Sequence, residues 1–144
     1  MCLCNDRRWP ETWRVMGMQD VDLVMLGYNT PVYNSVASES PHLRMFHNHI
    51  SMQAGAYQNG TWAVGTAKAG MEGGVDMMAG SCIIAPTGEI VALATTAEDE
   101  VIVAECDLDR GRYIRDTVFN FAQHRRIENY GLITERNEAI TPPE

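Results

Sequence analysis

The residue best suited to chemistry in this sequence is Cys4, because it lies where a short apolar start gives way to a polar turn and then to a predicted helix. A side chain at such a turn projects outward, and nearby helix N–H groups together with Arg7 and Arg8 would favour its thiolate form. A thiolate in that position is a plausible nucleophile. The backbone N–H of Asn5 could then face a developing oxyanion, a donor typically worth about 3–4 kcal/mol of barrier. The alternative for Cys4 is a small buried apolar residue.

The adjacent Arg7 and Arg8 indicate which kind of substrate such a nucleophile would meet. Each guanidinium can bind a carboxylate through two parallel hydrogen bonds, whereas a solvated turn is the alternative interpretation. The chain has 11 basic and 19 acidic residues, a net charge of −8. This balance disfavours nucleic acid or an anionic membrane surface as a partner. A small anionic substrate is still compatible with it, because local arginines can oppose the global charge.

The histidines and cysteines are candidates for a pocket or a metal site. His47 and His49 lie two residues apart on a predicted helix and therefore face different directions. His47 lies near the face formed by Leu43 and Ile50, so we expect it in the core or an interface, with a role near the pocket as the alternative. Cys-x-Cys and His-x-His are poor zinc spacings, and we expect no metal.

Hydrophobic periodicity predicts the elements that must position these residues. Predicted strands cover residues 22–26, 61–67, 81–85, 89–94 and 101–106, after a possible strand at residues 1–4. Predicted helices cover 10–19, 41–59 and a segment that begins at Asp107 or Asp109. Residues 31–40 and 68–80 are predicted loops, and Pro86-Thr87-Gly88 is the predicted turn of a hairpin. Mixed helices and strands predict a layered α/β or α+β domain, with antiparallel pairing among the late strands.

The clearest helix signal is the segment 41–59. Ser40-Pro41 supplies an N-cap and a first-turn proline, and Asn59-Gly60 supplies a C-terminal stop. Between them, apolar residues recur at helical spacing: Leu43, Phe46, Ile50, Ala54 and Tyr57. In the last predicted helix, one face is lined by Ile114, Val118 and Phe121.

The octet Cys-Asn-Asp-Arg-Arg-Trp-Pro-Glu at residues 4–11 resembles the nucleophile segment of the nitrilase (carbon–nitrogen hydrolase) superfamily. Within that superfamily it looks like the N-carbamoyl-D-amino-acid amidohydrolases. The similarity continues through residues 12–17, 26–31, 51–59 and 85–92 and runs to about Leu132. The octet is specific, whereas Pro-Thr-Gly-Glu in the last of these segments is common across the superfamily.

The resemblance implies a fold and a set of site residues. The fold is a four-layer α-β-β-α sandwich, of which residues 1–132 would form the C-terminal part, followed by an extended tail over 133–144. The family uses a Glu–Lys–Cys triad. The matching positions are Cys4 for the nucleophile, Arg7 and Arg8 for the substrate carboxylate, Asn29 and Thr30 for a pocket-lining turn, and His47 for a histidine at the corresponding place.

The activity implied is hydrolysis of N-carbamoyl-D-amino acids through a carbamoyl-enzyme on the cysteine, with no metal or organic cofactor and with a homo-oligomeric full-length form. The triad's glutamate and lysine lie upstream of the nucleophile, but only three residues precede Cys4, and Lys68 lies on a different element. We therefore expect a truncated chain that is inactive alone. The alternatives are a ureidopropionase-like or aliphatic amidase specificity, or a non-catalytic remnant that assembles with intact paralogues.

The remaining sequence features bear on location. No apolar run approaches the roughly 18 residues of a membrane-spanning helix, and the N-terminus lacks the pattern of a signal peptide. Four scattered cysteines are too few for a disulfide scaffold in a chain of this length. These features predict a cytoplasmic protein that spans no membrane.

Overall fold

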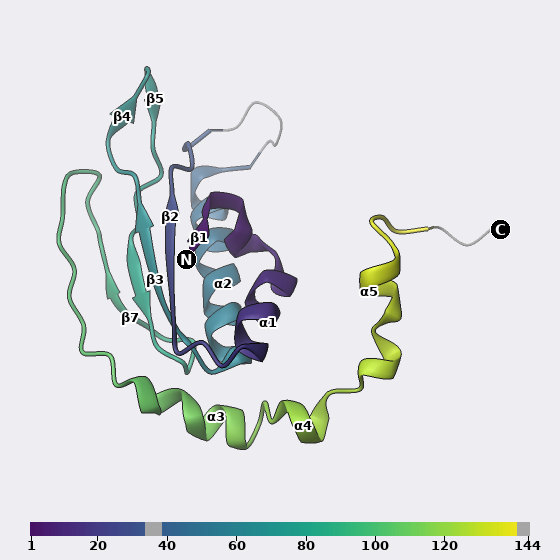
Figure 1. The fold of residues 1–144 in the computed structure, drawn as a ribbon. Coiled ribbons are helices and arrows are strands. Elements are labelled where there is room, and N and C mark those ends of the chain that lie inside the picture. The colour runs from purple at the N-terminus through teal and green to yellow at the C-terminus, as the bar shows by residue number, and fades with distance from the viewer. Residues whose placement is uncertain (34–38, 141–144) are drawn as a thin grey trace.

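The computed structural model describes residues 1–33 and 39–140 and contains one five-stranded sheet (Figure 1). Its strands, in spatial order, are β1 (Cys2–Leu3), β2 (Leu23–Tyr28), β3 (Trp62–Ala67), β6 (Cys82–Ile84) and β7 (Ile90–Leu93). The first three are parallel to one another, and β6 and β7 continue the sheet in antiparallel fashion. The α/β class and the late antiparallel hairpin are thus confirmed.

Helices α1 (Pro10–Met18) and α2 (Pro41–Asn59) cover one face of the sheet (Figure 1). The predicted limits of α2 are confirmed: Ser40 Oγ accepts a hydrogen bond from the Leu43 N–H at 3.3 Å, and Gly60 ends the helix in a left-handed conformation. The two helices pack closely at Gly55, where a Cβ atom would lie 2.2 Å from the Trp13 ring. Within the described residues, no helix is both long enough and apolar enough to cross a membrane.

The face of α2 that contacts the sheet is not the one that its apolar residues predict. The buried positions are Arg44, Asn48, Met52, Gly55, Ala56 and Asn59. The apolar positions Leu43, Phe46, Ile50 and Tyr57 are instead exposed, with Phe46 at 51%. The reason is that the small residues Gly55 and Ala56, together with Asn48, whose amide is hydrogen-bonded to Arg7 and Tyr28, allow α2 to lie close to the sheet.

Two apolar clusters stabilise the sheet. The larger one lies between the sheet and the helices and includes Trp13, Val24, Leu26, Met52 and Ile84. The smaller one is built on Trp62, Ile83 and Ala85, with Ile102, Ala104 and Cys106 packed against it.

The prediction of a strand at 101–106 is wrong, because this segment does not pair with another of the described strands. The segment joins no ladder among the described strands and has no backbone hydrogen bond to another described residue. Alternate side chains pack on Trp62 and its neighbours, while Val101 and Val103 point outward. The period of two therefore reflects one-sided packing rather than strand pairing.

The predicted single last helix is also wrong, because the chain forms a series of short helical segments. These are η2 (Leu108–Gly111), α3 (Arg112–Asp116), α4 (Phe121–His124), η3 (Ile127–Asn129) and α5 (Gly131–Glu135). Thr117 Oγ1 donates to the Tyr113 carbonyl, and Asn120 caps α4 through the Gln123 N–H. Such side-chain bonds to the backbone compete with helix continuation. Val118 is consequently exposed rather than aligned with Ile114.

Two segments expected to lack regular structure contain some. The predicted loop at 68–80 includes a small hairpin of β4 (Met71–Glu72) and β5 (Val75–Asp76). Helix α5 crosses the expected start of an extended tail at residue 133. Residues 34–38 of the predicted loop and residues 141–144 of the tail lie outside the described residues.

Candidate active site

The parallel strands bring three chemically useful residues to one edge of the sheet. Cys4 follows β1, Asn29 follows β2, and Lys68 follows β3. The pairing of Leu3 with Gly27 and of Gly27 with Thr66 aligns the ends of these strands. The carboxyl ends of parallel strands are a common place for binding and catalysis in α/β proteins. The candidate nucleophile therefore lies at the edge where a substrate would bind.

Cys4 itself is exposed and adopts a left-handed backbone conformation, with φ of 44°. It is the first residue of a 3-10 turn, η1 (Cys4–Arg8), that connects β1 to α1. A residue with a Cβ atom rarely adopts this conformation, and such residues cluster at functional sites. The geometry is that of a sharp strand-to-helix turn that presents a thiol.

Hydrogen bonds fix this turn at both ends. The Leu3 N–H donates to Asp6 Oδ2 at 3.0 Å, and the Trp13 ring N–H donates to the Arg7 carbonyl at 2.8 Å. Pro10 then begins α1, where a missing N–H has no cost. The octet of residues 4–11 thus builds the turn as well as supplying its reactive groups.

The two adjacent arginines, expected to act as a pair, have opposite surroundings. Arg7 is 1% exposed: its Nε donates to Asn48 Oδ1 at 2.7 Å, its Nη2 to Thr30 Oγ1 at 2.8 Å, and its Nη1 to the Cys4 carbonyl. Arg8 is exposed, and no described residue accepts a hydrogen bond or forms an ion pair with its guanidinium. Of the two guanidinium groups, that of Arg8 is therefore the accessible one among the described residues.

The Arg7 side chain is part of a buried network that the sequence did not reveal. Its guanidinium lies 4.1 Å from the centre of the Tyr28 ring, and Asn48 Nδ2 donates to the Tyr28 hydroxyl at 3.2 Å. Burial, followed by the charge of Arg8, lowers the pKa of Arg7. Burial raises the pKa of Tyr28 to about 12. Arg44 and Asn48 are polar residues one helical turn apart in α2, and this spacing is the sequence signal that could have indicated its buried face.

The remaining predicted site residues separate into exposed and buried positions. Asn29 is exposed, whereas Thr30 is buried as a partner of Arg7, and Asn5 is exposed beside Cys4. His47 contacts Glu39, with 2.9 Å between Nδ1 and Oε1, and its side chain is 44% exposed. A core position is therefore wrong for His47, because the Leu43 and Ile50 side of α2 faces outward, whereas a place in an interface or near the pocket stays a prediction.

His49 lies on another side of α2 and contacts Gly80, in the segment between β5 and β6. Its Nε2 lies 3.2 Å from the Gly80 carbonyl, which also accepts a hydrogen bond from the Tyr28 hydroxyl at 3.4 Å. The described residues contain no cluster of three or more histidine, cysteine or acidic side chains that could hold a metal ion.

The other cysteines are less suited to reaction than Cys4. Cys2 and Cys82 are buried, and Cys106 is half-buried. Burial raises the pKa of both Cys2 and Cys82, in the latter case to about 12. Cys4 is therefore the exposed thiol of the chain.

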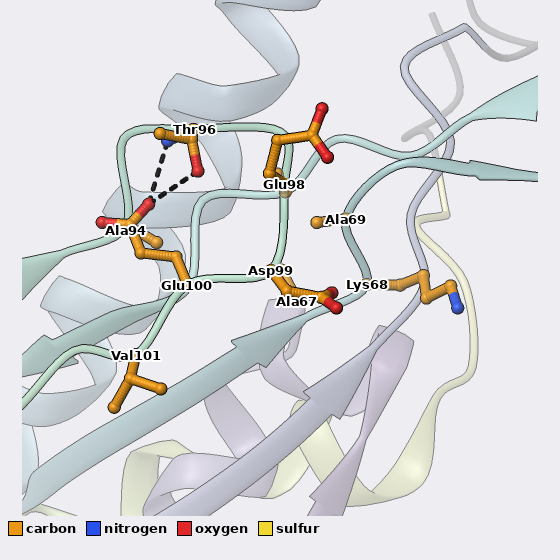
Figure 2. Close-up of a pocket in the computed structure, with 10 residues that line it drawn as sticks. Ala67, Lys68, Ala69, Ala94, Thr96, Glu98, Asp99, Glu100 and Val101 are labelled. Atoms are coloured by element: carbon orange, nitrogen blue, oxygen red, sulfur yellow. Dashed lines mark hydrogen bonds between the residues drawn. The ribbon is translucent and has the colours of Figure 1, made fainter.

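A depression of about 420 Å³ lies beside the same sheet edge (Figure 2). Its lining includes Lys68 and the acidic loop from Glu98 to Glu100, and Glu100 accepts hydrogen bonds from the N–H and hydroxyl groups of Thr96. The Lys68 side chain extends away from these carboxylates in Figure 2. Cys4 does not line this depression, so it is separate from the nucleophile turn.

Solved structures share this fold at low sequence identity. A carbon-nitrogen hydrolase from Helicobacter pylori G27 has a TM-score of 0.79 and 23% identity, over 93% of this chain and 48% of that chain. Saccharomyces cerevisiae Nit3, a member of branch 10 of the nitrilase superfamily, has a TM-score of 0.65 and 23% identity, over 86% and 42%. A mutant amidase from Nesterenkonia sp. AN1, with the acetamide moiety of fluoroacetamide added covalently at its active-site cysteine, has a TM-score of 0.62 and 20% identity, over 90% and 41%. The chain spans less than half the length of each.

The profile of the carbon-nitrogen hydrolase family matches residues 1–116. This stretch contains the Cys4 turn, the whole five-stranded sheet and both covering helices. With most of its length matched, the chain belongs to the carbon-nitrogen hydrolase family.

Proposed function

We propose that the chain carries the nucleophile and carboxylate-binding part of a hydrolase that converts N-carbamoyl-D-amino acids to D-amino acids, carbon dioxide and ammonia. The observation that carries this proposal is the exposed Cys4 thiol, in a left-handed turn at the carboxyl edge of the sheet, with the exposed Arg8 in the same turn. A thiol can attack the ureido carbonyl, and a guanidinium can bind the carboxylate of the same small molecule.

The reaction proceeds in two steps at Cys4. The sulfur attacks the carbamoyl carbon as its proton passes to a base, and the tetrahedral intermediate expels the amino acid, whose nitrogen gains a proton. Water then attacks the carbamoyl thioester, which restores the thiol and releases carbamate. Carbamate breaks down to carbon dioxide and ammonia. The Asn5 N–H is the candidate donor to the oxyanion in both steps.

The base and a second cation come from elsewhere in the proposed enzyme. The resemblance places a glutamate and a lysine upstream of the nucleophile, and three residues precede Cys4. General base catalysis typically contributes about two to four orders of magnitude in rate. We therefore expect no measurable turnover from residues 1–144 alone.

The test is ammonia release from N-carbamoyl-D-amino acids by residues 1–144, alone and co-expressed with the N-terminal half of an N-carbamoyl-D-amino-acid amidohydrolase. We expect turnover only in the combined sample, with Cys4→Ala inactive and Cys106→Ala active as the matched control. Turnover by the 144 residues alone would contradict the need for a second half. Turnover by the Cys4→Ala variant would exclude Cys4 as the nucleophile.

A simple aliphatic amide is the second candidate substrate. It is favoured by the Nesterenkonia amidase, whose cysteine carries an acetamide moiety. The two candidates differ in the need for a carboxylate. Turnover of an uncharged amide, without turnover of the N-carbamoyl-D-amino acid, would support the amidase alternative. If the N-carbamoyl-L-amino acid were turned over as fast as the D-isomer, the stereospecific part of the proposal would be wrong.

A further inference from the structure

The Arg7 guanidinium connects three segments that meet at the nucleophile turn. It donates to the Cys4 carbonyl in the turn, to Thr30 after β2, and to Asn48 in α2. One face of the guanidinium lies against the Tyr28 ring. Since Arg7 is 1% exposed, a substrate carboxylate could reach it only by breaking these bonds.

The bond to the Cys4 carbonyl also fixes the orientation of a second group. The Cys4 carbonyl and the Asn5 N–H belong to one planar peptide unit, and the described chain contains no cis peptide bond. In a trans unit the C=O and N–H point in opposite directions. Because Arg7 holds the carbonyl toward the buried network, the Asn5 N–H is directed away from it.

The same bond supports an unfavourable backbone conformation. The φ of 44° at Cys4 is disfavoured for a residue with a Cβ atom. Such a conformation persists only where surrounding contacts hold it. Two contacts supply that support: Asp6 accepts from the Leu3 N–H, one residue before Cys4, and Arg7 donates to the carbonyl of Cys4 itself.

We propose that Arg7 is a positioning residue that holds the Cys4–Asn5 peptide so that the thiol and the Asn5 N–H face the substrate, and that Arg8 alone of the pair contacts the substrate carboxylate. This division of roles rests on the proposed function for its substrate. The role of Arg7 concerns the nucleophile turn and is measurable without turnover.

The first experiment uses the 144-residue chain and the rate at which iodoacetamide alkylates Cys4, relative to Cys106 in the same molecule. Arg7→Lys keeps the positive charge but loses the planar set of donors, so the turn relaxes and the relative rate at Cys4 falls about fivefold. Arg14→Lys is the matched control, since Arg14 also stacks on an aromatic ring, that of Phe121, and donates to a backbone carbonyl. We expect it to stay within about twofold of the parent chain.

A second variant keeps the role of Arg7 testable if the Arg7→Lys chain does not fold. Thr30→Val removes one acceptor of Arg7 without altering the turn itself, and we expect it to lower the Cys4 rate in the same direction by about twofold. An unchanged Cys4 rate in both variants, with folding verified by circular dichroism, would overturn the positioning role.

The second experiment separates the two arginines in the combined enzyme described above, with an N-carbamoyl-D-amino acid and an uncharged amide as substrates. Arg7→Lys is expected to lower kcat about tenfold or more on both, with little change in KM, because the oxyanion donor is misdirected. Arg8→Lys is expected to raise KM for the acid alone about tenfold. A KM effect of Arg7→Lys confined to the acid would overturn the proposal. Failure of the parent enzyme on both substrates would overturn the proposed function, and the alkylation rates would still decide the role of Arg7.

Discussion

The two faces of α2 differ in a way that hydrophobicity does not describe. The face toward the sheet buries Asn48 and Gly55, whereas the face toward solvent carries Phe46 and Ile50. Polar atoms on the buried face hold the nucleophile turn through Arg7, and the missing side chain at position 55 admits Trp13. On the apolar face, the Tyr57 ring meets Phe119 edge-on, and Leu43, Phe46 and Ile50 are exposed. Stability and site geometry therefore depend on the face that looks less like a core.

The largest effect should come from adding a single carbon to the buried face. In Gly55→Ala the new Cβ would lie 2.2 Å from the Trp13 ring, so α1 and α2 must separate. We expect a loss of about 3 kcal/mol in the free energy of unfolding, the upper range for overpacking. Urea denaturation measures it, with Ile50→Ala on the exposed face as the control. Similar losses from both substitutions would contradict the difference between the faces.

Removing the buried amide should have the next largest effect. Asn48→Leu leaves the Arg7 Nε–H without its acceptor and the Tyr28 hydroxyl without its donor. Buried groups without partners typically cost about 1–3 kcal/mol, and we expect a loss near the top of that range, measured by urea denaturation. Asn48→Asp keeps an acceptor for Arg7 and should lose less. An Asp variant less stable than the Leu variant would show that Arg7 needs no acceptor at this position.

High pH should lower the free energy of unfolding gradually, through two buried groups, Tyr28 and Cys82. Burial raises the pKa of Cys82 from 9.0 and of Tyr28 from 10.0 to about 12 in each case. The unfolded chain therefore loses these protons at lower pH than the folded chain does. The contribution of the two groups to the free energy of unfolding is fully present below about pH 9 and falls as the pH rises toward 12. Each group contributes a slope of about 1.4 kcal/mol per pH unit above its unfolded value. Urea midpoints across this range should fall, and Cys82→Ala should remove the part that begins near pH 9.

The smallest effect is expected on the exposed face. Phe46→Gln removes a large apolar side chain that is 51% exposed, so we expect a change in the free energy of unfolding within about 0.5 kcal/mol. The measurement is again urea denaturation, beside Met52→Gln on the buried face as the contrasting variant. A loss above about 2 kcal/mol from Phe46→Gln would mean that this face is covered in solution.

Local signals in the sequence were sufficient for most of the fold. Ser40-Pro41 and Asn59-Gly60 fixed the ends of α2, and Pro86-Thr87-Gly88 fixed the turn of the β6–β7 hairpin. These signals succeed because capping and turn formation depend on neighbouring residues alone. The predicted last helix failed at Thr117 and Asn120, whose side chains bond to the backbone in a way that periodicity does not detect.

The candidate site was less predictable than the fold. The octet of residues 4–11 located the turn, and Cys4 and Arg8 are exposed within it, where a substrate could reach them. The partners of Arg7 could not be inferred in the same way, since Thr30 and Asn48 lie 23 and 41 residues away in the chain. Such long-range contacts depend on which face of α2 is buried. The apolar pattern predicted the opposite face.

In the segment 101–106, side-chain packing occurs without backbone hydrogen bonding to another described residue, although the two usually occur together. Its inner side chains are packed against Trp62, yet its amide groups have no acceptor among the described residues. Hydrogen exchange at these amides should therefore be as fast as in an open loop, while the Trp62 fluorescence reports a dry environment. A segment whose backbone N–H groups are unpaired among the described residues is also one to which another strand can add. Side-chain packing already sets the register of this segment, so an incoming strand would meet a template that is held in place but not yet paired.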